Sequence, residues 1–247
     1  KGALMKKMVA MVAVLALVSG ACGGGDDRDE RADTVDDTAQ GDTERDQNDD
    51  QAAGDVDVEQ ALLALEDMPT GWTTSPDAGE EDEGAAEFCA GLDITDDEAD
   101  ADAEASFQGS EMGPFVSHAV ARFDGGGDTR FAQLRKAIDG CGDFDITDEE
   151  GNTLTGRLSA VSFPEFGEES LAVRLSGTVT TVADPDFGEL EFPMAADLIF
   201  FRRGDALAGL FHLAIDTSAF GGGGGGLDST ITEDLARKAE EKLAAVA

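Results

Sequence analysis

The stretch Leu171-Ala-Val-Arg-Leu-Ser-Gly-Thr-Val-Thr180 shows the most regular two-residue alternation in the chain. Leu171, Val173, Leu175 and Val179 are apolar, and the residues between them are mostly small or polar. Because successive side chains of a β-strand point to opposite faces, this pattern predicts a strand with one buried and one solvent-facing side. Such half-buried strands are typical of antiparallel sheets.

Further strands are predicted on both sides of this stretch. The candidate segments are 115–123, 154–160, 195–202 and 206–215. The last two flank Arg203-Gly204-Asp205, which is a sequence typical of a hairpin turn. Consecutive strands joined by short turns favour a largely antiparallel sheet with helices packed on it, so the predicted fold class is α+β.

Three segments carry helical signals. The first is the short apolar pattern Glu59–Glu66, and the second is Thr129–Ile138 with Asp128 as its expected N-cap. The third is the C-terminal segment, in which Thr230 and Glu233 have the spacing of a capping box. We expect these helices to pack on the sheet.

The chain of 247 residues divides into three parts of different composition. Residues 1–21 contain three lysines and no acid, whereas residues 22–58 contain 14 of the 54 acidic side chains and few large apolar residues. Residues 59–247 are long enough for one domain with its own core. The net charge of −37 repels phosphate backbones and argues against nucleic-acid binding. The surplus of acids over lysine is similar to the surface composition of salt-adapted proteins.

Residues 1–21 have the features of an export signal. The apolar run Met8–Val18 follows Lys6 and Lys7 and leads into Ser19-Gly20-Ala21-Cys22. This order of a cationic start, an apolar stretch and a small-residue end predicts a secretory signal peptide. The run is shorter than the roughly 20 residues that a membrane-spanning helix needs.

The small residues before Cys22 resemble the lipobox of bacterial lipoproteins, although Ser19 stands where that family usually has leucine. The resemblance implies that residues 1–21 are removed and that Cys22 carries a thioether-linked diacylglycerol anchor, which is enough for stable attachment. Residues 22–58 would then form a disordered acidic linker between the membrane and a domain at residues 59–247. An ordinary cleaved signal with an incidental cysteine is the alternative.

Two cysteines remain if Cys22 is lipidated. An even pair in an exported domain predicts a disulfide bond between Cys89 and Cys141. Such a bond would contribute on the order of 4 kcal/mol by constraining the unfolded chain. A redox site or metal thiolates are the alternatives, but the chain has no Cys-x-x-Cys motif.

The sequence contains no recognisable catalytic or cofactor-binding motif. The only two histidines, His118 and His212, lie in strand patterns without a nucleophile motif around them, so both are predicted to be structural. Four acids partly match a calcium-loop frame: Asp100, Asp102, Glu104 and Glu111. Ala105 occupies the position that should be glycine, so we interpret the segment as a solvated acidic loop without a metal.

The segment Glu66-Asp-Met-Pro-Thr-Gly-Trp72 resembles the Asp-Leu-Pro-x-Gly-Trp segment of many exported actinobacterial lipoproteins. The helix that ends at Cys141 fits the same layout, which is also similar to the extracellular sensor domains of mycobacterial serine/threonine kinases and to the α/β sandwich of photosystem-II extrinsic proteins. The resemblance implies a non-catalytic domain, and it identifies no site residues in this chain. We therefore expect a lipid-anchored binding, sensing or interaction domain with a cell-wall, lipid or protein ligand and no cofactor. A structural envelope protein is the alternative, and a hydrolase with acidic catalytic groups is less favoured.

Overall fold

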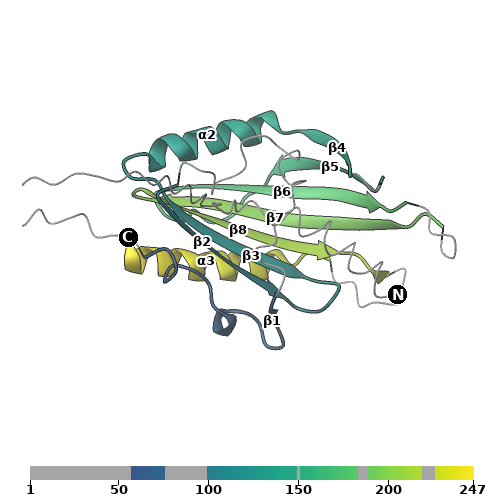
Figure 1. Ribbon diagram of the computed structural model, residues 1–247, viewed down its shortest axis with the longest axis horizontal. Coiled ribbons are helices and arrows are strands. Elements are labelled where there is room, and N and C mark those ends of the chain that lie inside the picture. The colour runs from purple at the N-terminus through teal and green to yellow at the C-terminus, as the bar shows by residue number, and fades with distance from the viewer. Residues whose placement is uncertain (1–56, 76–98, 149–150, 183–187, 219–225) are drawn as a thin grey trace, which may run out of the picture.

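The computed structural model describes residues 57–75, 99–148, 151–182, 188–218 and 226–247. Within these residues the chain forms an eight-stranded antiparallel sheet in the order β1-β2-β3-β8-β7-β6-β5-β4. Helix α2 lies on one face of the sheet and helix α3 on the other (Figure 1). The predicted α+β fold with a largely antiparallel sheet is confirmed.

The strands are β1 Thr73–Thr74, β2 Ala101–Gln108, β3 Phe115–Arg122, β4 Asp143–Thr147, β5 Thr153–Ala160, β6 Glu169–Thr180, β7 Glu191–Arg203 and β8 Ala206–Ile215. The helices are the 3-10 helix η1 Leu65–Asp67, α2 Gly127–Gly140 and α3 Ser229–Val246. All five predicted strands are present, as β3, β5, β6, β7 and β8. None of the helices in the described ranges is long and apolar enough to cross a membrane.

The β7–β8 hairpin forms the centre of the sheet. All ten residues of β8 are buried, and such strands, covered on both faces, read as continuous apolar runs. In β7, Leu198 and Phe200 pack in the layer under α2, whereas Ile199 and Phe201 pack in the layer under α3. The two strands turn at Gly204, whose φ is +57°, and the predicted hairpin is therefore confirmed.

Helix α2 packs Phe131, Leu134 and Ile138 onto its face of the sheet. It begins directly against the β7–β8 turn, because a Cβ at Gly127 would lie 2.7 Å from the Cα of Asp205. Only glycine allows this approach. The predicted helix is confirmed, but its expected N-cap is wrong.

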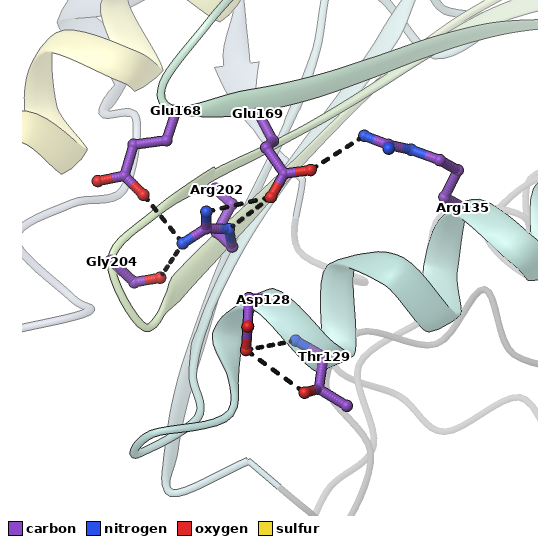
Figure 2. A network of polar contacts seen from close by, with 7 residues as sticks. All are labelled: Asp128, Thr129, Arg135, Glu168, Glu169, Arg202 and Gly204. Atoms are coloured by element: carbon purple, nitrogen blue, oxygen red, sulfur yellow. Dashed lines mark hydrogen bonds and ion pairs between the residues drawn. The ribbon is translucent and has the colours of Figure 1, made fainter.

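Gly126 caps α2 without a side-chain hydrogen bond. Asp128 lies inside the first turn, where its Oδ1 accepts a hydrogen bond of 2.7 Å from the backbone N–H of Thr129 (Figure 2). The close packing of Gly127 moves the start of the helix to a position ahead of the aspartate.

Arg202 holds the hairpin end of the sheet to α2 (Figure 2). Its guanidinium lies 2.9 Å from Glu168 and 3.1 Å from Glu169, and it also donates to the carbonyl of Gly204 at 2.8 Å. The other oxygen of Glu169 accepts from Arg135 on α2 at 3.2 Å. Both carboxylates are partly exposed, so each pair contributes less than about 1 kcal/mol and acts chiefly by fixing geometry.

Helix α3 covers the opposite face with Leu235, Ala236, Ala239 and Leu243. Its N-cap is Asp228, whose Oδ1 accepts from the backbone N–H of Thr230 at 3.0 Å. The predicted helix is confirmed, but the expected capping box at Thr230 is wrong. Asp228 is the N-cap, so the helix begins at Ser229, one residue before Thr230.

Segment 57–72 completes the layer on the α3 side. Val58, Ala61, Leu63 and Met68 are buried there. The predicted helix Glu59–Glu66 is wrong, since the segment forms a turn followed by the short η1. An eight-residue helix is marginal without help, and the amide of Leu63 donates to a side chain of the sheet instead of to a helical carbonyl.

Helix α2 ends at Gly140, two residues beyond the predicted Ile138, and Cys141 is its C-cap. Cys141 is disulfide-bonded. Cys89 and Cys22 both lie outside the described residues, so the pairing of Cys141 with Cys89 stays a prediction. The predicted signal peptide, lipidation site and linker up to residue 56 also lie outside them.

Candidate functional site

The polar residues of greatest interest lie between the sheet and α3. Arg174, Asp197 and His212 stand directly opposite one another on β6, β7 and β8, so they form one row across the same face. Thr232 of α3 is buried above this row. We call Arg174, Asp197, His212 and Thr232 the polar row.

Asp197 is the charged centre of the polar row. Its side chain is fully buried. Its Oδ1 accepts a hydrogen bond of 2.7 Å from Nε of Arg174 and lies 2.7 Å from Nη2 of the same guanidinium as an ion pair. Its Oδ2 accepts from the hydroxyl of Thr232 at 3.1 Å. A buried carboxylate needs such partners, because loss of one member of a buried ion pair costs about 3–5 kcal/mol.

The hydrogen bonds fix the tautomer of His212. The carboxylate of Asp197 can only accept, so the hydroxyl hydrogen of Thr232 points towards it. The Thr232 oxygen lies 2.8 Å from Nδ1 of His212 and must accept the hydrogen that Nδ1 carries. In the neutral ring Nε2 is then a bare acceptor.

His118 on β3 has the opposite arrangement. Its Nδ1 accepts a hydrogen bond of 3.1 Å from the backbone N–H of Leu63 in segment 57–72. The ring is fully buried, and in its neutral form the hydrogen therefore sits on Nε2. His118 thus bonds segment 57–72 to the sheet, as His212 bonds α3.

Burial keeps both histidines uncharged. Desolvation lowers the pKa of His118 to about 3, and the nearby Lys242 acts in the same direction while Asp67 opposes it. Desolvation also lowers the pKa of His212 to about 4, although Asp197 and Asp228 work against the shift. Neither ring can act as a proton donor in its charged form near neutral pH.

Segment 57–72 is bonded to α3 as well as to the sheet. The carboxylate of Asp67 lies 3.0 Å from Nζ of Lys242 and accepts from the N–H of Ala64 at 2.8 Å. Lys238 donates to the Asp67 carbonyl. Burial alone would raise the pKa of Asp67, but these donors outweigh it and lower the pKa. Trp72, the only tryptophan, ends the segment with its ring centroid 6.4 Å from that of His212.

The arrangement of Asp197, Thr232 and His212 resembles the chain of groups that orients a catalytic base. The acceptor atom of His212 is nevertheless buried inside the protein, so a substrate would have to enter the layer under α3 to reach it. In the described ranges no group of three or more His, Cys, Asp or Glu side chains could hold a metal ion. The contacts of Asp197, Thr232 and His212 join α3 to the sheet.

The strand positions of both histidines were predictable from the sequence, but the polar row around His212 was not. His118 lies in β3 and His212 in β8, as predicted. Asp197 interrupts an apolar run in β7, and a charge inside a continuously buried strand is the signal that predicts a paired group. Its partners lie 23 and 35 residues away, so no local motif indicates them.

Residues 101–108 of the acidic segment that partly matches a calcium loop form strand β2, so its interpretation as a solvated loop is wrong there, whereas Asp100 and Glu111 lie in an exposed bend and an exposed turn. Asp102 and Glu104 lie in β2, which pairs with β3 along its whole length. The neighbouring Ala101, Ala103 and Ala105 pack towards α3, and Glu104 accepts a hydrogen bond of 2.5 Å from the hydroxyl of Ser117. Burial raises the pKa of Glu104, while hydrogen bonds from Ser117 and Ser106 partly oppose the shift.

Beyond α3, the same face of the sheet carries exposed hydroxyl groups. We call this the hydroxyl face, and it comprises Thr147 of β4, Thr155 and Ser159 of β5, and Ser176 of β6, all exposed. The register places these residues on the side of the polar row. Asp143 and Arg157 stand opposite each other among them and form an ion pair of 2.7 Å.

Comparison with known proteins adds no assignment. No protein-family model matches the chain, and no curated protein matches it. The site must therefore be judged from its own geometry.

The lowered histidine pKa values predict loss of stability in acid. In the unfolded chain His212 binds a proton near pH 6.5, whereas in the folded protein it stays neutral down to about pH 4. Stability should therefore fall with pH between 6.5 and 4, by up to about 1.4 kcal/mol per unit for this residue. In His212→Asn, whose amide can still donate to Thr232, this contribution is absent.

Urea unfolding of the wild type and His212→Asn at pH 7, 6 and 5 measures the effect. The stability difference between the two proteins should narrow as the pH falls. A difference that is constant with pH, or that widens in acid, would show that the folded ring is not held neutral.

Proposed function

We propose that this protein is a lipid-anchored, extracytoplasmic binding or interaction module without catalytic activity. The observation that carries the proposal is the order of the sequence: an apolar leader, the small residues before Cys22, an acidic stretch and then the folded domain. An acidic linker of this length spans about 30–35 Å when flexible, and repulsion between like charges extends it further. It would hold the domain away from the membrane.

The architecture supports a rigid recognition domain. Helices cover both faces of the central strands, and buried hydrogen bonds join α3 and segment 57–72 to the sheet. Both histidines use Nδ1 for these internal bonds. A rigid surface binds at a lower entropy cost than one that must be ordered first.

The hydroxyl face is the surface that we propose for the ligand. It lies on a regular sheet, its hydroxyl groups can both donate and accept, and the charges of Asp143 and Arg157 offset each other within it. The whole chain carries a charge of −37, which repels anionic lipids and phosphate polymers. A neutral, hydroxyl-rich glycan of the cell wall is the ligand class that fits these properties.

The anchor is tested by comparing the wild type with Cys22→Ala, both expressed with the leader in a bacterial host that processes lipoproteins. In a detergent phase partition, the wild type should enter the detergent phase with an added diacylglycerol mass on its N-terminal peptide. The variant should stay in the aqueous phase, because it lacks the acylated thiol. Wild-type protein that is aqueous and unacylated would contradict the anchor.

The glycan surface is tested by sedimentation with insoluble neutral cell-wall polysaccharide. Thr155→Val with Ser176→Ala removes two hydroxyl groups from exposed positions and should weaken binding roughly tenfold, since each lost hydrogen bond costs about 0.5–1.5 kcal/mol. Thr73→Val is the matched control, because Thr73 is exposed on β1 at the far edge of the sheet.

Equal binding of the control, the double variant and the wild type would show that the ligand does not bind at the hydroxyl face. Binding of the wild type to anionic vesicles and not to the glycan would reject the proposed ligand class.

A further inference from the structure

One ring nitrogen of each histidine is buried without a hydrogen-bond partner among the described residues. Nε2 of His118 and Nε2 of His212 are both inaccessible to solvent and have no hydrogen-bond partner among the described residues. An unsatisfied buried polar atom costs about 1–3 kcal/mol, and most such atoms in proteins are satisfied by protein or by ordered water. Two of them in one layer therefore indicate a common partner.

The register makes the two histidines near neighbours on the sheet. His118 stands opposite Leu210 on β8, and His212 stands opposite Val116 on β3. The histidines are thus diagonal neighbours on the same face, with Cα atoms roughly 7–8 Å apart. At this separation one small molecule can contact both rings.

The tautomers of the two rings are complementary. Since the N–H of Leu63 donates to Nδ1 of His118, Nε2 of this ring is a donor. Since Nδ1 of His212 donates to Thr232, Nε2 of that ring is an acceptor. A molecule between them must accept from one ring and donate to the other, which a water molecule does and a metal cation does not.

We propose that His118 and His212 form a buried binding site for one bridging water molecule. This molecule would complete a single chain of hydrogen bonds in which every donor points the same way. The chain runs from the Leu63 amide through His118, the water, His212 and Thr232 to the carboxylate of Asp197. Donors aligned in this way polarise one another and end on the group best able to accept, a buried anion.

The site gives the water molecule a structural role. It connects the hydrogen bond between Leu63 of segment 57–72 and His118 to the hydrogen bonds that hold α3. The two parts of this layer would then be energetically coupled although they belong to distant parts of the sequence. The Nδ1 contacts set opposite tautomers in the two rings, and these are the tautomers that a single bridging water needs.

The test uses the intact folded protein, labelled with ¹⁵N. Long-range ¹H–¹⁵N correlation spectra at pH 7 distinguish the tautomers of the two rings, which are assigned with the single variants His118→Asn and His212→Asn. The proposal predicts hydrogen on Nε2 of His118 and on Nδ1 of His212, with cross-relaxation between the Nε2 hydrogen and a bound water. The same tautomer in both rings, a direct ring-to-ring hydrogen bond, or no bound water would overturn it.

A double-variant cycle measures the energetic coupling between His118 and His212 independently of the spectra. Asparagine at either position keeps the bond made by Nδ1 but removes Nε2. Either single change already removes the bridge. The unfolding constant of the double variant should therefore be roughly tenfold smaller than the value expected from multiplying the two single effects. Asp145→Asn on the exposed edge strand β4, combined with His118→Asn, should be additive. Additivity of the two histidine changes would contradict the bridge. If these variants do not fold, the wild-type spectra decide, with each ring assigned by through-bond correlation to its own backbone.

Discussion

The α3 side of this structure depends on keeping one carboxylate, Asp197, inside the protein. A buried negative charge is tolerated only when its partners are close and well aligned. Here Arg174 supplies the opposite charge from the neighbouring strand, and Thr232 supplies a hydroxyl from α3. The requirement to satisfy Asp197 therefore fixes where α3 sits on the sheet, and through Thr232 it also fixes the tautomer of His212.

The two faces of the sheet are closed by different means. Under α2 the contacts are apolar, with Phe131, Leu134 and Ile138 against the strands, and the Arg202 network holds the rim. Under α3 an apolar cluster surrounds specific hydrogen bonds that select one position for the helix and for segment 57–72. Apolar packing supplies most of the stabilisation, whereas the buried polar groups restrict the number of arrangements that satisfy them.

The sequence predicts those parts of the fold whose signals are local. The alternation in Leu171–Thr180, the apolar run of β8 and the turn at Gly204 were enough to place the central strands. Strand β2 was missed because its inward residues are mostly alanines, which give weak contrast against Asp102 and Glu104. The polar row was missed because its members come together only through register and helix placement, and the helix predicted at 59–66 failed because tertiary hydrogen bonds override a short apolar pattern.

The polar row holds α3 on the sheet, and native-state hydrogen exchange can measure its contribution. In Thr232→Val the helix keeps its shape, but Asp197 and His212 lose the hydroxyl between them. We predict that the α3 amides from Leu235 to Leu243 exchange roughly 10–100-fold faster than in the wild type, in line with the loss of satisfied buried groups. The amides of β6 and β7 should change less. Unchanged exchange in α3, or an equal loss of protection across the whole sheet, would show that the polar row does not hold the helix in place.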